Sequence, residues 1–277
     1  MILRQVLMEG AKALREAGIE GPERDARLLL AEVIGMPAAR MSLEPDLKVT
    51  EAQTKEFHGF LARRAAREPV SKILGRRNFW GRDFEITPDV LDPRPETETL
   101  IDLVLKGAKP DTILDLGCGS GIIALTLLAE LPEAQAQASD ISQACLDVTL
   151  RNAKTLSVLD RLTTIKSNWF SEIEGEFDLI VSNPPYISDA EMAELSLDVL
   201  NHDPHLALTP GGDGLPPYEV LAKGARKHLA PKGRILVEIG YRQGPDVVRI
   251  FQDAGLVEVA CQKDLNGHDR VVSAHQS

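Results

Sequence analysis

The tetrapeptide Asn183-Pro184-Pro185-Tyr186 follows the run FDLIVS, which has the composition of a buried strand. Each proline fixes its own φ at about −65° and restricts the residue before it to an extended conformation. The Asn183 amide and the Pro184 carbonyl are therefore held outward, where their oxygens can accept both N–H bonds of one planar NH2 group. Carbonyl dipoles there also stabilise positive charge that develops on the nitrogen. The pattern predicts a site that orients an amide or an exocyclic base amine, with Tyr186 stacked on the substrate plane; a simple strand-ending turn is the alternative.

A glycine-rich segment, Asp115 to Gly121, lies between a strand-like and a helix-like run. Glycine lets the backbone turn sharply and approach a ligand, and a doubly wound sheet binds its ligand at this position. A dinucleotide fingerprint would have its third glycine at position 122, but that residue is Ile122. The spacing therefore favours S-adenosylmethionine over NAD. The cofactor-binding residues expected in this loop are Asp115, Gly117, Cys118, Gly119, Ser120 and Gly121.

Two residues further along the chain would complete a cofactor site. Asp140 ends the second predicted strand, where its carboxylate can accept hydrogen bonds from both hydroxyls of a ribose. Its alternative role is to cap the next helix, which Ser142 could equally do. Trp169 follows the third predicted strand and either covers an adenine ring or packs in the core.

The composition is that of a globular protein, with 277 residues, 43% hydrophobic residues and a net charge of −11. No apolar run approaches the roughly 18 residues of a membrane span, and the amino terminus lacks a signal-peptide core. We therefore expect a cytoplasmic protein that does not bind membranes. Its three cysteines, Cys118, Cys145 and Cys261, are far apart and form no CxxC pair, so we expect neither a disulfide framework nor a metal.

From residue 112 onward, strand-like and helix-like runs alternate. This order indicates an α/β fold with a parallel, doubly wound, Rossmann-like sheet of about seven strands. The predicted strands cover residues 112–116, 135–139, 162–166, 177–181, 233–239, 257–262 and 270–274. Their carboxyl ends place both the glycine loop and the Asn183 tetrapeptide at one edge of the sheet.

The first part of the chain has a different character. Residues 1–75 are predicted to form a small helical domain, residues 76–92 a β-hairpin linker that turns at Gly81, and residues 93–277 the catalytic domain. Residues 1–80 carry 14 Lys and Arg against 11 Asp and Glu, whereas the remaining 197 residues carry 17 against 31. This split indicates different partners for the two regions. The most basic stretch, residues 60–82, is expected to contact RNA or an acidic protein.

The motifs resemble those of the PrmC/HemK-type protein-(glutamine N5) methyltransferases, and the resemblance spans nearly the whole chain. The tetrapeptide alone is shared with adenine-N6 and guanine-N2 methyltransferases. Its combination with the segment PRPETE, residues 93–98, is more specific. Further similar segments are Arg24-Asp25-Ala26, Leu29-Leu30, Glu68-Pro69-Val70, Phe79-Trp80-Gly81 and Asn168-Trp169-Phe170.

The resemblance implies a class I S-adenosylmethionine-dependent methyltransferase that modifies the GGQ glutamine of class I peptide chain release factors and releases S-adenosylhomocysteine. It assigns the glycine loop, Asp140, Trp169 and Asn183 to the cofactor. The glutamine side chain would be held by Asn183, Pro184, Pro185 and Tyr186, with Asn183, Pro184 and Tyr186 as the catalytic set. The helical domain would bind the protein substrate.

Two departures from the family pattern put local loop packing and substrate fit in doubt. Asp92 stands where an apolar residue is usual, and His202-Asp203-Pro204 replaces an aromatic-Glu-Pro sequence. Arg94 and Glu98 are either lid contacts near the cofactor or solvated charges of a helix.

Two other functions fit parts of the pattern. A nucleic-acid amine methyltransferase would present the same NH2 group to the tetrapeptide, but the acidic catalytic region would repel phosphates. A silent cofactor-binding adaptor is less consistent with an intact set of converging acceptors. We therefore expect a protein substrate in preference to a nucleic acid.

Overall fold

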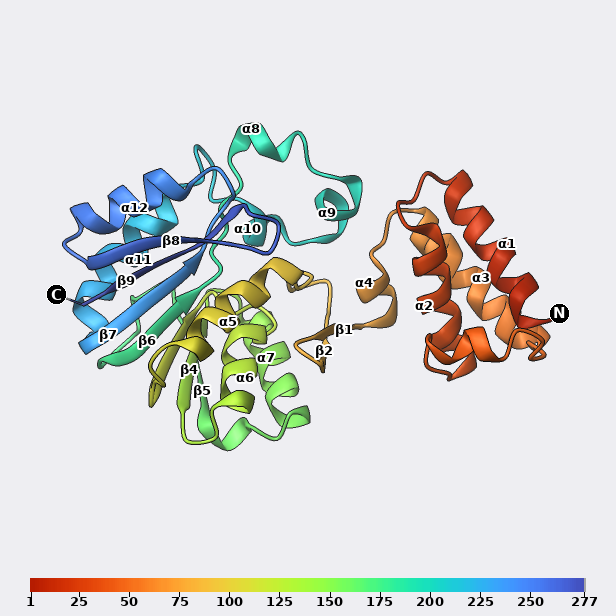
Figure 1. Cartoon of the computed structure of the whole chain (residues 1–277), viewed down its shortest axis with the longest axis horizontal. Coiled ribbons are helices and arrows are strands. Elements are labelled where there is room, and N and C mark those ends of the chain that lie inside the picture. Colours follow the sequence, from red (N-terminus) through yellow and green to blue (C-terminus); the bar gives the residue numbers. More distant parts are fainter. Residues whose placement is uncertain (277) are drawn as a thin grey trace. The chain divides into compact units, whose positions relative to one another are not determined.

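A computed structural model of the chain describes residues 1–276. The chain forms two compact units, one of residues 1–76 with 196–202 and one of residues 77–195 with the chain from 203 onward. These units differ from the predicted boundaries in two places. The β-hairpin belongs to the catalytic unit, and the short segment 196–202 belongs to the helical unit. Figure 1 shows the helices and strands of each unit.

The helical character predicted for the first part of the chain is confirmed. Helix α2 begins at Pro22 and ends before Gly35, whose positive φ of 65° forms the C-cap. Thr50 caps α3, and Gln53 completes its capping box. The elements are α1 (Leu3–Glu16), α2 (Pro22–Ile34), η1 (Arg40–Leu43), α3 (Glu51–Ala65), α4 (Val70–Leu74) and α9 (Leu197–His202).

An apolar core holds this unit together. Leu14, Leu29 and Phe57 are fully buried and come from three different helices. Gly10 permits a close approach of α1 and α3, since a Cβ atom there would lie 2.5 Å from the Phe57 ring. The helices therefore form one packed body with its own core.

The catalytic unit is built on a seven-stranded sheet with the order β5-β4-β3-β6-β7-β9-β8. All seven predicted strands are confirmed, but the expectation of a wholly parallel sheet is wrong. Strand β9 is antiparallel to both of its neighbours, because the short turn between β8 and β9 cannot support a parallel crossover. The strands are β3 (Thr112–Leu116), β4 (Gln135–Asp140), β5 (Leu162–Lys166), β6 (Phe177–Ser182), β7 (Leu229–Glu238), β8 (Val257–Lys263) and β9 (Asp269–His275).

Helices cover both faces of this sheet, and successive strand residues point to opposite faces. Ile113 belongs to the core beneath α5, α6 and α7, whereas Leu114 belongs to the core beneath α11 and α12. The helices and 3-10 turns are η2 (Pro95–Thr97), α5 (Glu98–Lys106), α6 (Ile122–Glu130), α7 (Gln143–Thr155), η3 (Leu159–Arg161), α8 (Asp189–Met192), α10 (His205–Leu208), α11 (Pro216–His228) and α12 (Gly244–Asp253). Among residues 1–276, no helix is long and apolar enough to cross a membrane.

The predicted β-hairpin is confirmed as β1 (Arg76–Phe79) and β2 (Arg82–Glu85). Phe79 and Phe84 meet edge to face with ring centroids 6.3 Å apart, and both join the core beneath α6. The Asn152 side chain on α7 accepts a hydrogen bond from the Glu85 backbone at 2.7 Å. The hairpin is thus fixed to the catalytic unit by packing and by hydrogen bonds.

Candidate active site

A cavity of about 390 Å³ lies at the carboxyl edge of the sheet in the catalytic unit. It brings the glycine loop together with part of the proline tetrapeptide. The predicted site residues that line it are Gly117, Cys118, Gly119, Ser120, Asp140, Trp169, Asn183 and Pro185. The predicted residues outside its lining are Asp115, Gly121, Pro184 and Tyr186.

The glycines of the loop have two different structural roles. Gly117 and Gly119 adopt positive φ values of 72° and 57°, and a Cβ atom at either position would meet open space. These two positions therefore leave the cavity open beside the backbone. Gly121 is the N-cap of α6, where a Cβ atom would lie 2.9 Å from Leu125 and from Thr149. A residue with a side chain at position 121 would therefore disturb the packing between α6 and α7.

Asp140 has the contacts expected of a residue that binds a ligand while ordering its own loop. One carboxylate oxygen accepts from the Gly119 backbone N–H at 3.0 Å, and the other accepts from the Ser142 backbone N–H at 2.9 Å. Burial raises its pKa, while these two hydrogen bonds oppose the shift. Each carboxylate oxygen retains acceptor capacity toward the cavity. Ser142 is the N-cap of α7, so Asp140 does not have this role.

Asp115 is fully buried beneath the loop. Its Oδ2 accepts from the Ala124 backbone N–H in the first turn of α6 at 3.1 Å, whereas its Oδ1 has no partner within residues 1–276. Burial raises the pKa of this carboxyl to about 7. Asp115 does not line the cavity, so the cofactor contact expected for it stays a prediction.

Trp169 lines the cavity and also packs partly against the core of the α11 side. Both roles considered for it from the sequence are therefore compatible with its position. Its φ of 52° is unusual for a residue with a side chain. The Ser167 hydroxyl donates to the Trp169 carbonyl at 2.7 Å and helps to hold that conformation.

The proline tetrapeptide is held from behind by several polar contacts. Gln243 donates to the Tyr186 carbonyl at 3.0 Å, and Gly214 approaches that carbonyl so closely that a Cβ atom would lie 2.2 Å from it. The Asn183 side-chain N–H donates to the Thr97 hydroxyl at 3.4 Å. The Tyr186 hydroxyl donates to Glu238 at 3.5 Å. The Tyr186 hydroxyl is therefore directed toward Glu238, and the expected stacking of its ring on the substrate stays a prediction.

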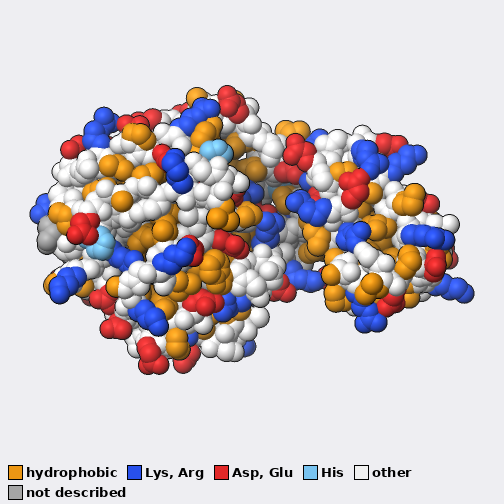
Figure 2. All heavy atoms as spheres, in the orientation of Figure 1, with side chains coloured by type: hydrophobic (Ala, Val, Ile, Leu, Met, Phe, Trp, Pro, Cys, Tyr) orange, Lys and Arg blue, Asp and Glu red, His pale blue; other side chains and the backbone are white. Residues whose placement is uncertain are grey.

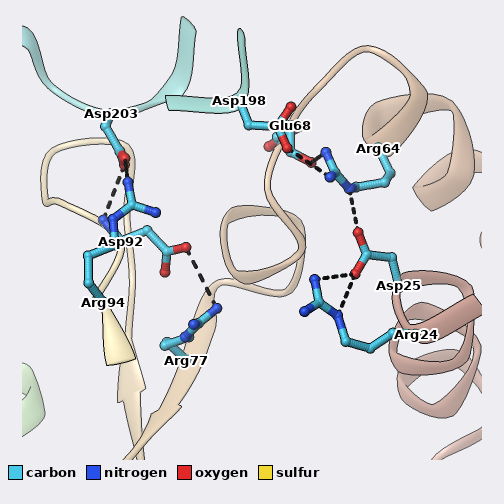
Figure 3. A network of polar contacts seen from close by, with 9 residues as sticks. All are labelled: Arg24, Asp25, Arg64, Glu68, Arg77, Asp92, Arg94, Asp198 and Asp203. Carbon is cyan, nitrogen blue, oxygen red and sulfur yellow. Dashed lines mark hydrogen bonds and ion pairs between the residues drawn. The ribbon is translucent and has the colours of Figure 1, made fainter. Parts of the chain in front are cut away.

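Several arginines of the basic stretch at residues 60–82 form ion pairs with the protein's own carboxylates, and the expected contact of this stretch with RNA or an acidic protein stays a prediction. Arg64 is 6% exposed, and its guanidinium pairs with Asp25 and with Asp198, each at 2.8 Å (Figure 3). On the face of the helical unit visible in Figure 2, basic and acidic side chains are interspersed. Further ion pairs of the stretch are Arg63 with Glu68, Arg76 with Glu32, Arg77 with Asp92, and Arg82 with Glu130.

The two departures from the family pattern contact each other. The Asp203 carboxylate accepts from the Asp92 backbone N–H at 3.1 Å and from the Arg94 guanidinium at 2.6 Å (Figure 3). Pro93 and Pro204, their neighbours in sequence, line the cavity together with Arg94. The two departures thus form one polar contact at the rim of the site. Glu98 lies elsewhere and accepts from the Trp80 backbone at 3.3 Å.

Two residues of the site were not identified from the sequence. Thr97 lines the cavity, and Glu238 lies behind it at the end of β7 with an exposed fraction of 1%. The signal for Glu238 was the same as for Asp140, an acidic residue at the carboxyl end of an apolar strand. Within residues 1–276, no group of three or more His, Cys, Asp or Glu side chains could hold a metal ion.

Comparisons with known proteins agree with this geometry. Residues 5–75 match the model of the PrmC N-terminal domain, and residues 94–215 match the methyltransferase small domain. Among solved structures, a methyltransferase from Pyrococcus furiosus is similar in fold, with a TM-score of 0.57 and 17% identity over 78% of this chain and 99% of that one.

Curated relatives extend the similarity over the whole chain. The release factor glutamine methyltransferase of Rhodospirillum rubrum is 43% identical over 100% of this chain and 86% of its own length. That of Cereibacter sphaeroides is 50% identical over 96% of this chain and 98% of its own length. Identity at this level over both units shows that the chain belongs to the release factor glutamine methyltransferase family.

Proposed function

We propose that this protein transfers the methyl group of S-adenosylmethionine to the side-chain amide nitrogen of the GGQ glutamine in class I peptide chain release factors. The observation that carries the proposal is the single cavity that Asp140 and Asn183 share. A cofactor site and an amide-orienting site therefore lie next to each other, as methyl transfer requires.

The residues around the glycine loop fit S-adenosylmethionine. Asp140 offers two acceptor oxygens for a ribose, and the open positions at Gly117 and Gly119 allow close approach of a ligand. Trp169 offers an aromatic face in the same cavity. When bound, the cofactor supplies an electrophilic methyl group on a sulfonium. No residue of this site is needed to activate the methyl group.

The substrate amide is the part that the chain itself must orient. The Asn183 and Pro184 oxygens would accept its two N–H bonds, which leaves the nitrogen facing the cofactor side of the cavity. Their dipoles stabilise the positive charge that develops on that nitrogen. Because the cavity brings Asn183 beside the glycine loop, this orientation needs no movement of the sheet.

A protein substrate is favoured over a nucleic acid by the state of the arginines. The basic stretch that would contact phosphates is engaged in ion pairs with the protein's own carboxylates. We assign the helical unit to binding of the release factor, in line with its match to the PrmC N-terminal domain. A release factor works on the ribosome, so we place the reaction in the cytoplasm.

The test is mass spectrometry of release-factor peptides after incubation with labelled S-adenosylmethionine. We expect one labelled methyl group on the GGQ glutamine and none on a release factor in which that glutamine is replaced by asparagine. A short GGQ peptide should be a much poorer substrate than the intact factor. Label in co-purified nucleic acid, with none in the release factor, would overturn the proposal.

A further inference from the structure

Glu238 is a buried carboxyl group that the function described so far does not use. It ends β7, is 1% exposed, and does not line the cavity. Thr97 and Glu96 of η2, Tyr186, and Arg270 of β9 face its carboxyl, and the Tyr218 hydroxyl of α11 donates to its main-chain carbonyl. Burial raises the pKa of Glu238 to about 7. A buried carboxylate is costly unless it is hydrogen-bonded or paired, and Glu238 accepts from two hydroxyls, those of Thr97 and Tyr186.

A chain of hydrogen bonds connects this carboxyl to the tetrapeptide. The Thr97 hydroxyl, itself fully buried, donates to Glu238 Oε2 at 2.7 Å. The Asn183 Nδ2 group donates to the same hydroxyl at 3.4 Å. A hydroxyl has one hydrogen, and a carboxylate oxygen can only accept. The Thr97 hydrogen is therefore committed to Glu238, and only the lone pairs of Thr97 Oγ1 face Asn183.

This polarity determines which way the Asn183 amide is turned. An amide has an oxygen end that accepts and an NH2 end that donates, and the two ends have nearly the same shape. Facing lone pairs, Asn183 must direct its NH2 end to Thr97. Its Oδ1 is then the end that is left for a substrate. With the amide turned over, its NH2 group would oppose the NH2 group of the substrate, and neither could accept.

We propose that Glu238 and Thr97 are positioning residues that fix the orientation of the Asn183 amide, so that its oxygen faces the amide nitrogen to be methylated. The inference rests on the proposed function, since it specifies how that site selects an NH2 group. It adds two residues that do not touch the reacting atoms but act through Asn183.

Protonation of Glu238 reverses this chain. A neutral carboxylic acid donates one hydrogen, so protonated Oε2 would donate to Thr97, and the Thr97 hydrogen would then turn to Asn183. The Thr97 hydrogen would then bond to the Asn183 amide oxygen. The Asn183 amide would rotate so that its oxygen faces Thr97 and its NH2 group faces the substrate. Turnover should therefore fall as the pH drops through the pKa of Glu238.

The first test replaces the hydroxyl. Thr97→Val keeps the shape of the side chain but removes the donor, and we expect kcat to fall about 10- to 100-fold, less than for loss of a direct partner. The dissociation constant for S-adenosylmethionine, measured by calorimetry, should not change. Thr97→Ser restores the hydroxyl and should recover most of the loss.

A matched control is available in α6. Thr126 is also fully buried, and its hydroxyl has no partner within residues 1–276. Thr126→Val should leave kcat unchanged. Equal losses in Thr97→Val and Thr97→Ser, or a loss in Thr126→Val as large as in Thr97→Val, would show that packing rather than hydrogen-bond polarity matters and would overturn the inference.

The second test uses the carboxyl. Glu238→Gln keeps an oxygen that can accept from Thr97 but cannot gain a proton in this pH range. We expect a small loss of kcat at pH 8, and we expect the fall in kcat below about pH 7 that is predicted for the wild-type protein to be absent from this variant. If kcat of Glu238→Gln fell at low pH as it does in the wild-type protein, protonation of Glu238 would not be what reverses the hydrogen-bond chain.

A third readout does not depend on activity, so it separates the inference from the proposed function. The side-chain NH2 signals of Asn183 can be identified in nitrogen-15 NMR spectra by their loss in Asn183→Ala. Their exchange with water should be slow in the wild-type protein and in Thr97→Ser, but fast in Thr97→Val. Equal exchange in all three would overturn the inference even if glutamine is methylated; slow exchange without glutamine methylation would overturn only the proposed function.

Discussion

The pKa values of acidic side chains are shifted in opposite directions in the helical unit and around the catalytic cavity. In the helical unit, opposite charges pair directly, so the pKa of Glu68 is lowered by its hydrogen bonds with Arg63 and that of Arg64 is raised by Asp25 and Asp198 despite its burial. Around the cavity, burial raises the pKa values of Asp115, Asp140 and Glu238. Charged side chains in the first region pair with one another, whereas the acids in the second accept hydrogen bonds from backbone N–H groups and hydroxyls.

This contrast separates stability from function. A buried ion pair is costly to break because one charge is left without its partner, so the Arg64 cluster should matter for folding. Asp115 has one carboxylate oxygen without a partner, and the Glu238 carboxylate accepts hydrogen bonds from neutral hydroxyls, so neither acid is explained by a stabilising ion pair. The predictions below compare the two regions, beginning with the largest expected effect.

Asn183→Ala should abolish most activity while leaving the fold intact. Loss of one preorganised acceptor at the developing charge corresponds to a fall in kcat of about 10²- to 10³-fold. Affinity for S-adenosylmethionine should fall far less, and the melting temperature should not change. Asn183→Asp is the informative companion, because it keeps an acceptor and adds a charge. Near-normal turnover of Asn183→Ala would show that the tetrapeptide is only a turn.

Arg64→Ala should have the opposite profile. It leaves Asp25, whose side chain is 2% exposed, with Arg24 as its remaining partner, and removes the 2.8 Å pair with Asp198. We expect the free energy of unfolding to fall by about 3 kcal/mol. The measurement is urea unfolding followed by circular dichroism.

Arg63→Ala is the matched control for this change. Arg63 is one residue away and pairs with Glu68, but its side chain is 44% exposed. Its removal should cost about 1 kcal/mol or less. Equal costs for the two arginines would remove the distinction between a buried cluster and solvated pairs.

Much of the fold was predictable because its signals are local. The apolar runs of the seven strands and the hairpin turn at Gly81 depend on neighbouring residues, and the elements they predict are confirmed. The reversed direction of β9 depends on the length of the turn that precedes it. Short helices such as α8 and α10 have few turns and no strong apolar period, so the sequence did not reveal them.

Site residues could be predicted from the sequence only where a single polar residue directly follows a predicted strand. Asp140 and Asn183 follow strands, and the topology alone brings them to one edge. The pairing of Arg64 with Asp198 joins residues that are 134 positions apart, and a count of charges cannot show it. For the same reason, composition cannot show that arginines of the basic stretch form ion pairs, some exposed as at Arg63 and one cluster buried at Arg64.

Asp140→Ala should weaken the binding of S-adenosylmethionine. Loss of a charge-assisted contact is worth about 1.5–3 kcal/mol, which corresponds to roughly a 10- to 150-fold rise in the dissociation constant. The Gly119 and Ser142 N–H groups also lose their acceptor, so part of this effect comes from the loop. Calorimetry measures it, and Asp147→Ala on the exposed face of α7 serves as the control. Unchanged affinity would remove Asp140 from the cofactor site.

The smallest expected effect is a difference in how the two regions respond to pH. Asp115 and Glu238 have pKa values of about 7 in the folded protein, against about 4 in an unfolded chain. Between these values the folded state binds more protons, so lowering the pH from 7.5 to 5.5 should stabilise the catalytic unit by up to about 2 kcal/mol for each of the two groups. This gain is complete below the unfolded pKa and is lost as the pH rises through about 7.

The helical unit should not respond over this interval. The pKa of Glu68 is lowered, so the stability it contributes is present above its unfolded value of about 4 and is lost only as the pH falls further. Hydrogen exchange, corrected for the intrinsic effect of pH, should show slower opening at pH 5.5 in β3 and β7 but not in α2 and α3. Asp115→Asn should reduce the gain, because an amide cannot take up the proton. An equal gain in both units would mean that the two regions do not differ in how they hold their charges.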